Sequence, residues 1–169
     1  IMPSRDGALL VGGSLDSGVL HVGDPVELVG LGLRQPVVVS GLEQFRRPIT
    51  AAHSPIRSLV VALDGIAPNA ITPGQVLCAP DSLAAHARFT ACISLLSEKE
   101  GGRPAAMSGG EPLVFRWGPA DLKGVAMVSP GVQAGTMGSI SVVDIELPGP
   151  VALAKHDTFQ LWSLNKRCL

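Results

Sequence analysis

Charged residues are scarce in this 169-residue chain: they make up 16% of it, and the formal net charge is −1. A protein that binds nucleic acid over its whole surface needs concentrated lysine and arginine to neutralise phosphates. The composition therefore argues against a generally basic nucleic-acid binder, without excluding a local basic patch. Residues 1–82 hold five arginines, no lysine and seven acids, whereas residues 83–169 hold eight basic residues and seven acids. The second half is thus the better candidate for contact with a polyanion.

The chain also lacks a disulfide framework and a long apolar run. Its three cysteines, Cys78, Cys92 and Cys168, are odd in number and have no metal-ligand spacing, which favours reduced thiols in an interior compartment. The longest apolar stretches, such as residues 59–63, are too short to cross a bilayer, so we expect no membrane association. No signal or transit peptide is visible at the start. Because the chain opens at Ile1, we expect it to be an excised fragment.

Motifs for catalysis are missing as well. No Gly-Lys pair occurs, so the phosphate-binding loop of a GTPase is absent. Residues 121–124 match Asp-x-x-Gly and residues 165–166 begin an Asn-Lys-x-Asp, but neither has a strand-to-helix context, and Cys168 stands where Asp is required. No Gly-x-Ser-x-Gly, His-x-x-x-His or Cys-x-x-Cys pattern is present. The histidines are scattered along the chain, at His21, His53, His86 and His156. We therefore expect no enzyme activity, no metal site and no cofactor in this chain.

Short apolar runs punctuated by 20 glycines and 14 prolines make up most of the sequence. Runs of this length between turn residues are typical of β-strands. Residues 141–147 end in the alternation expected of a half-buried strand, and no window of 12 or more residues has helical periodicity. The pattern predicts an all-β fold of antiparallel barrels or sandwiches. The runs that we expect to be strands are residues 19–22, 26–29, 36–40, 59–63, 75–78, 88–96, 113–117, 139–147 and 158–162.

A stretch of small residues over 79–86 separates two blocks of similar size, each with several predicted strands. Such a stretch is typical of a short linker between domains. The sequence therefore predicts two domains, 1–82 and 83–169, which we expect to be two small antiparallel β-barrels in tandem.

The order of motifs along the chain points to a known family. Residues 17–30 match the opening hairpin of the second domain of translational GTPases, and residues 39–47 match the strand-to-loop segment that follows it. The closing motifs of that domain are matched, in the same order, at residues 63–66 and 71–80. Residues 95–104, Leu-Leu-Ser-Glu-Lys-Glu-Gly-Gly-Arg-Pro, resemble the start of the third domain of elongation factor Tu, bacterial or mitochondrial. Its Pro-Gly turn and Pro-Val-Ala-Leu strand are matched at 129–131 and 150–153. The chain thus resembles domains 2 and 3 of this family over nearly its whole length.

The resemblance implies a function in translation. Domain 2 would cover 1–82 and domain 3 would cover 83–169, the latter truncated at its C-terminus because the family's last strand is absent. In the family these barrels bind aminoacyl-tRNA and deliver it to the ribosome together with a separate GTPase domain, which holds GTP and magnesium. The expected partners are aminoacyl-tRNA, a GTPase domain and, through the parent factor, the ribosome. The expected location is a bacterial cytoplasm or a mitochondrion. The tRNA-binding residues that carry over are Gly101, Gly102, Arg103, Arg5 and Arg167.

The segment around Arg103 has a physical reason to contact RNA. Two glycines let a backbone approach a ribose-phosphate chain closely, and an arginine guanidinium forks onto a phosphate. The alternative is that Gly101 and Gly102 form a hairpin turn and that Arg103 is a solvated surface charge. We expect a β-hairpin at the mouth of the second barrel.

Several family positions differ here. Asp64 replaces an arginine that the family uses near the 5′ end of tRNA, which reverses the charge facing phosphate. Residues 54–58 replace the segment that lines the aminoacyl end, and Gly149 replaces a lysine. Because phosphate contacts dominate affinity for nucleic acid, these changes weaken the expected tRNA binding. The alternative function is a diverged structural or interaction paralogue without tRNA delivery.

Overall fold

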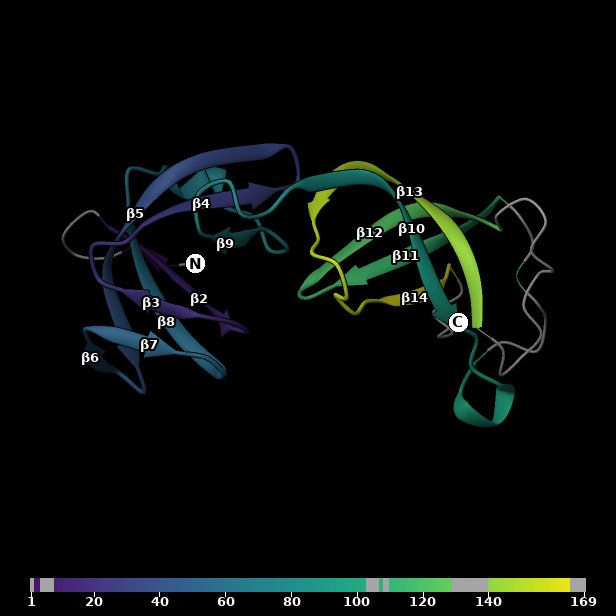
Figure 1. Ribbon diagram of the computed structural model, residues 1–169, viewed down its shortest axis with the longest axis horizontal. Coiled ribbons are helices and arrows are strands. Elements are labelled where there is room, and N and C mark those ends of the chain that lie inside the picture. The colour runs from purple at the N-terminus through teal and green to yellow at the C-terminus, as the bar shows by residue number, and fades with distance from the viewer. Residues whose placement is uncertain (1, 4–7, 103–106, 108–109, 129–139, 165–169) are drawn as a thin grey trace. The chain divides into compact units, whose positions relative to one another are not determined.

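The computed structural model describes residues 2–3, 8–102, 107, 110–128 and 140–164. These residues form an all-β protein in which every strand pairing is antiparallel (Figure 1). Over the described ranges the only helical segments are two short 3-10 turns, η1 (Pro68–Ala70) and η2 (Glu98–Glu100). The prediction of an antiparallel all-β fold is confirmed.

The chain divides into two compact units, Ile1–Ala84 and Ala85–Leu169. The division lies inside the segment 79–86 that the sequence predicts as a linker. The last two residues of that segment are already part of a strand, because β10 begins at Ala85. His86, which we expected in the linker, is therefore a strand residue.

The first unit contains a seven-stranded sheet, in which the strands follow the order β1-β2-β8-β5-β4-β9 with β6 paired to β5, and a separate two-stranded ribbon of β3 and β7. The strands are β1 (Met2–Pro3), β2 (Leu9–Leu15), β3 (Val19–His21), β4 (Pro25–Gly30), β5 (Leu33–Gln44), β6 (Arg47–Ile49), β7 (Ala51–His53), β8 (Ile56–Asp64) and β9 (Val76–Cys78).

The long strand β5 makes this sheet curl. Its first half pairs with β4, from Leu33 opposite Gly30 to Val38 opposite Pro25, and its second half pairs with β8 and β6. The change of partner coincides with a register shift between Val39 and Gly41. A shift of this kind bends a strand and increases its twist. The strands that pair with the two halves of β5 therefore pack around the same core.

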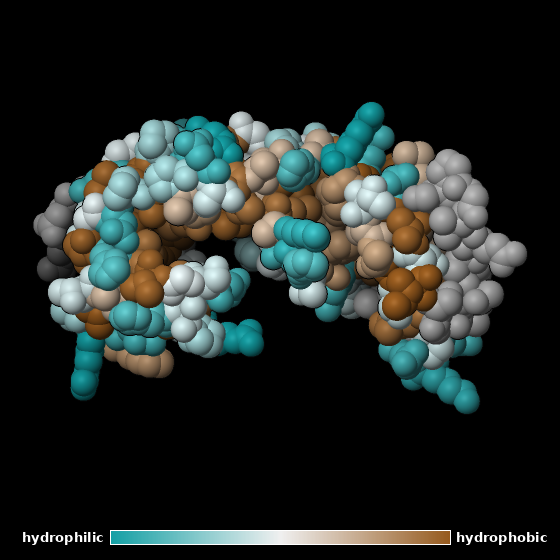
Figure 2. All heavy atoms as spheres, viewed as in Figure 1, coloured by the Kyte–Doolittle hydropathy of each residue, from teal (hydrophilic) through white to brown (hydrophobic). Residues whose placement is uncertain are grey.

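Alternation along the strands fills the core of the first unit. Along β5, Val37, Val39 and Leu42 are buried while Val38 and Ser40 are exposed, as expected for a sheet with one solvated face. On the face shown in Figure 2, hydrophobic residues gather on the inner side of these curved strands. Full burial of a side chain of this size contributes about 1.5–3 kcal/mol. The buried cluster consists of Leu9, Val26, Leu28, Val37, Val39, Leu42, Ala52, Leu59, Val61, Leu63 and Ile71.

The segment after β9 is bound to the first unit. The guanidinium of Arg34 donates to the carboxylate of Glu27 and to the carbonyl oxygen of Leu83. The same carboxylate accepts the backbone N–H of Asp81 at 3.1 Å. One ion-pair cluster therefore holds the chain in place just before the second unit begins.

The second unit contains a five-stranded sheet, in which the strands follow the order β10-β13-β12-β11-β14. The strands are β10 (Ala85–Ser94), β11 (Glu111–Trp117), β12 (Ala120–Val128), β13 (Ile140–Ala152) and β14 (Gln160–Ser163). Trp117 lies opposite Ala120, so β11 and β12 are joined by the two-residue turn Gly118-Pro119. The φ of Gly118 is 51°, which suits the first position of a tight hairpin turn.

Aromatic rings form the centre of the second core. Phe115 is fully buried and makes an edge contact with Phe89, at 5.6 Å between ring centroids. Phe159 packs on both rings, with centroid distances of 6.0 and 4.9 Å. Each aromatic pair of this kind contributes about 0.5–1.5 kcal/mol of stability beyond the burial of its two rings. Leu113, Ile145 and other buried side chains of this unit complete the core: Ile93, Leu95, Met107, Ala120, Ala126, Val143, Leu147, Val151, Ala152 and Leu161.

Candidate functional site

The loop after β10, which the sequence singles out for RNA binding, has a defined structure up to Gly102. Ser97 donates to Oε2 of Glu100 twice, from its hydroxyl at 2.6 Å and from its backbone N–H at 2.9 Å. These hydrogen bonds, the hydroxyl first, lower the pKa of the Glu100 carboxyl. The N–H of Gly101 donates to the Glu98 carbonyl at 3.1 Å, and the N–H of Gly102 donates to the Ser97 carbonyl at 2.9 Å. The loop is thus a closed turn in which the ionised carboxylate of Glu100 is bound to the first residue, Ser97.

The two glycines of this turn are required for different reasons. Gly101 has a φ of +87° and open space around it, so it supplies a left-handed backbone at an exposed position. Gly102 is buried, and a Cβ there would lie 2.0 Å from the carbonyl oxygen of Leu96. The missing side chain at Gly102 therefore serves packing within the chain. Contact between RNA and this glycine pair stays a prediction.

The loop is not a hairpin turn, contrary to the expectation from sequence. Within the described residues, β10 pairs with β13, whereas β11 pairs with β12 and β14. The strands on either side of this loop, β10 and β11, are therefore not neighbours in the sheet. The pairing of β10 with β13 joins residues that are between 46 (Ser94 and Ile140) and 67 (Ala85 and Ala152) positions apart, which a local turn pattern could not reveal.

Three of the five predicted tRNA-binding residues, Arg103, Arg5 and Arg167, lie outside the described residues. The structure describes Gly101 and Gly102, which are neighbours in one turn. Asp64, the residue that reverses a family charge, ends β8 at an exposed position opposite Val38. The following turn is fixed, because the Gln35 side chain donates to the Gly65 carbonyl at 2.9 Å.

Three arginines of the described chain are bound to carboxylates. Arg34 pairs with Glu27 in the first unit. In the second unit, Arg88 pairs with Glu146 at 2.6 Å, and Arg116 holds Asp121 through two hydrogen bonds of 2.7 and 2.8 Å. This bidentate contact lowers the pKa of Asp121. An arginine held in this way is a weak phosphate ligand, because phosphate has to displace a carboxylate that is already in place.

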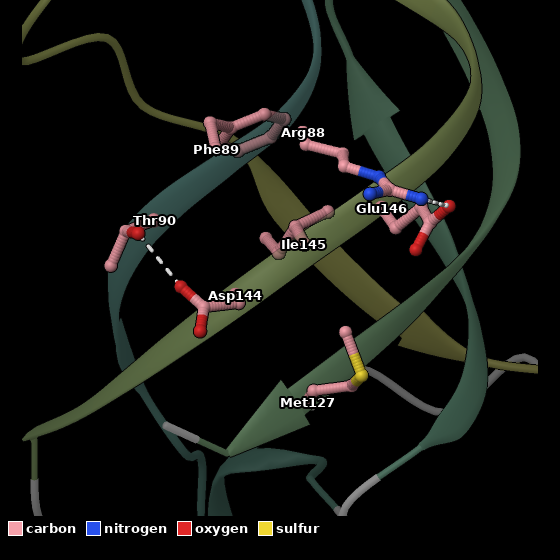
Figure 3. Close-up of a pocket in the computed structure, with 7 residues that line it drawn as sticks. All are labelled: Arg88, Phe89, Thr90, Met127, Asp144, Ile145 and Glu146. Atoms are coloured by element: carbon pink, nitrogen blue, oxygen red, sulfur yellow. Dashed lines mark hydrogen bonds and ion pairs between the residues drawn. The ribbon is translucent and has the colours of Figure 1, made fainter. Parts of the chain in front are cut away.

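A depression in the second unit lies over β10, β13 and β12 (Figure 3). It has a volume of about 290 Å³, and the close-up shows Arg88 turned toward Glu146 and Thr90 turned toward Asp144, at 2.7 Å. Met127 supplies an apolar wall from the neighbouring strand. Arg88 neutralises Glu146, whereas Asp144 is bonded to a neutral hydroxyl, so the depression keeps a net negative charge that does not favour an anionic ligand.

A different arrangement is found at the turn between β5 and β6, which the sequence did not single out as a site. Gln44 lies opposite Arg47, so Phe45 and Arg46 form a two-residue turn, with φ of 51° and 62°. Phe45 is 81% exposed. Arg46 and Arg47 are exposed as well, and neither has an ion pair among the residues that the structure describes. The sequence does contain a signal, an aromatic residue followed by two arginines, but the exposure of these side chains depends on the turn.

Among the described residues, no group of three or more His, Cys, Asp or Glu side chains is arranged to hold a metal ion. No helix in the described part of the chain is long and apolar enough to cross a membrane. No family model matches the chain.

Proposed function

We propose that this chain is the tandem β-barrel portion of an elongation factor Tu-like translation factor, and that its second unit contacts aminoacyl-tRNA through the loop that begins at Ser97. The proposal rests on the order of motifs over nearly the whole sequence, carried by a chain that folds as two all-β units divided at Ala84. The observation that carries it furthest is the closed turn of Ser97–Gly102, which leads directly into Arg103.

The same proposal includes a barrel in each unit, with the second barrel left open. In the second unit β10 and β14 are the two ends of the strand order. The family's last strand, which would lie between them, is absent from the sequence, so the unpaired N–H and C=O groups of an edge stay exposed there. In the first unit β5 changes partner midway and bends the sheet, as barrel strands do.

Nucleotide binding and hydrolysis would belong to a separate GTPase domain, because the chain has no phosphate-binding loop. The part played by this chain would be to position the tRNA acceptor region by backbone and phosphate contacts. Such contacts set affinity and register and carry little sequence information. A translation factor that handles many tRNAs needs recognition of this kind.

A second candidate function is a diverged interaction protein without tRNA delivery. The observation that favours it is the state of the charged residues: Arg34, Arg88 and Arg116 are bound to carboxylates, and Asp64 is exposed where the family has an arginine. Fewer available cations mean fewer released counterions and weaker binding.

A binding measurement separates the two candidates. Labelled aminoacyl-tRNA is titrated with the chain, with Arg103→Gln and with Lys123→Gln, an exposed lysine of β12 that serves as the control of equal charge change. The tRNA proposal expects salt-sensitive binding that Arg103→Gln weakens by about 5- to 10-fold and Lys123→Gln leaves unchanged. Absence of binding below about 100 μM, the weak end of nonspecific affinity, would favour the interaction protein.

A further inference from the structure

The segment that joins the two units is held at both of its ends. The carbonyl oxygen of Leu83 accepts a hydrogen bond from the guanidinium of Arg34, a residue of β5 in the first unit. Ala85 is already paired with Ala152 of β13 in the second unit. One residue, Ala84, therefore lies between the last position bound to the first unit and the first position bound to the second.

Arg34 holds this segment because Glu27 fixes its side chain. The two residues belong to the paired strands β4 and β5, and the Glu27 carboxylate, which is 13% exposed, accepts one arm of the guanidinium. A guanidinium is planar and presents several donors in fixed directions. While its Nη1 is bound to the carboxylate, its Nη2 is aimed at the Leu83 carbonyl.

The same carboxylate also binds the segment directly. Oε2 of Glu27 accepts the backbone N–H of Asp81 at 3.1 Å. Asp81 has a φ of 57°, a left-handed conformation that is uncommon for a residue with a side chain and has to be fixed by its surroundings. Ser82 closes the turn, because its N–H and its hydroxyl donate to the Ala79 carbonyl at 3.1 and 2.6 Å.

Surface contacts, rather than burial, hold this segment in place. Residues 79–82 and Ala84 are exposed, and Leu83 is half-buried. The Arg34 side chain is itself 43% exposed, so dissolved ions screen its attraction to Glu27. Contacts of this kind open more readily than a buried core, and their opening leaves the core strands paired.

We propose that the Arg34–Glu27 pair is a latch that sets the length of the free tether between the two units. With the latch closed, the tether is the single residue Ala84, which spans at most about 3.6 Å. With the latch open, residues 79–84 are released together, and a chain of this length spans up to about 20 Å. The latch thus controls how widely the second unit reorients relative to the first, while the fold of each unit is unchanged.

This inference goes beyond the proposed function, because it concerns the joining segment and requires neither RNA nor a GTPase domain. Arg103→Gln, which tests the proposed function, should leave the latch unchanged. Failure of either proposal is therefore visible without the other.

The test uses the full chain and measures two quantities by NMR. Amide hydrogen exchange at Asp81 reports whether the segment is bound, and backbone relaxation gives the rotational correlation time of each unit. The variants are Arg34→Gln and Glu27→Gln. The matched control is Arg88→Gln, because Arg88 lies in the strand that follows the segment and forms an ion pair of 2.6 Å, but with Glu146. The wild type is also measured at low salt and at about 1 M salt, where charges are screened within about 3 Å.

We expect Arg34→Gln to speed exchange at Asp81 by about ten-fold, as for the loss of one charge-assisted hydrogen bond. Arg34 does not bind the Asp81 amide, so this result would show that the contacts of the latch open together. The correlation times of the two units should fall in Arg34→Gln and in Glu27→Gln, because the units then tumble more independently. Arg88→Gln should behave as the wild type, and high salt should shift the wild type toward the variants without any substitution.

Three results would overturn the proposal. The first is wild-type exchange and tumbling in both latch variants, or an equal effect of Arg88→Gln. The second is independent tumbling of the two units in the wild type at low salt, because the closed latch would then restrict nothing. The third is loss of protection along β5 together with Asp81, because the ion pair would then stabilise the sheet rather than the segment.

Discussion

Replacing Gly102 with alanine should destabilise the second unit strongly, because the added methyl group has no room. An ideal Cβ at Gly102 would lie 2.0 Å from the carbonyl oxygen of Leu96, 2.5 Å from its carbonyl carbon and 2.8 Å from its Cβ. Two of these three atoms belong to the backbone, so no side-chain rotation relieves the contact. The turn has to open by more than an ångström.

The cost follows from what the turn would lose. Overpacking of a tightly packed site costs about 1–3 kcal/mol. Opening the turn also breaks the hydrogen bond from Gly102 to the Ser97 carbonyl, which contributes about 1 kcal/mol. The total is about 2–4 kcal/mol. For a unit of this size each kcal/mol lowers the melting temperature by about 4–8 °C, so a decrease of about 8 °C or more is expected.

Tryptophan fluorescence gives a selective assay for this change. The chain has two tryptophans, Trp117 and Trp162, and both lie in the second unit. Gly101→Ala is the matched control: its Cβ would meet open space, and its cost of about 1 kcal/mol comes only from the positive φ. If Gly102→Ala melted with the wild type, or if Gly101→Ala were the more harmful change, the described packing of this turn would be wrong.

Two further predictions concern the turn between β5 and β6 and the edge strand β10. The double variant F45N/R46G should raise the stability of the first unit by about 1–2 kcal/mol, because Asn-Gly suits a turn in which both residues have positive φ. Calorimetry should show this rise, while the melting of the second unit, followed by tryptophan fluorescence, stays unchanged. A loss of stability would refute the turn geometry. If the second barrel is open, amide hydrogen exchange should be slow only at alternate residues of β10, which then pairs with β13 alone, whereas slow exchange at successive residues would mean that the sheet closes.

The sequence predicted the class of the fold because apolar runs bounded by glycine and proline coincide with buried strands. Residues 141–147 show this most clearly, since their alternation becomes the buried and half-buried faces of β13. The strand β12 was missed for a physical reason. Its inward positions include Gly124 and Ala126, and Gly124 is small because the Leu147 side chain and the Glu146 carbonyl lie directly against it. A strand with small inward residues carries little hydrophobic signal.

Two other elements were hidden by glycine and by turn composition. The strand β2 contains Gly12 and Gly13, which are typical of turns, although its pairing with β8 is continuous from Leu9 to Gly13. The hairpin of β5 and β6 has a turn without glycine or asparagine, so it lacked the usual signal. The exposure of Phe45 was not predicted for the same reason, because it follows from the turn.

Charge counts along the sequence favoured the second half as the contact for a polyanion. In the structure, however, some of the arginines counted there are bound to carboxylates. Both arginines described in the second unit, Arg88 and Arg116, are bound to carboxylates that face them across a strand pair. Arg116 also stacks over Trp162, with its guanidinium carbon 4.8 Å from the ring centroid, which fixes it further. The first unit holds Arg34 in the same way but leaves Arg46, Arg47 and Arg57 exposed at one end of a sheet. Affinity for a polyanion depends on cations that are free to exchange their counterions, and pairing across strands, which composition does not reveal, removes three arginines from that number. The exposed lysines of the second unit, Lys99, Lys123 and Lys155, remain in it, so the described cations without an ion pair are as many in one unit as in the other.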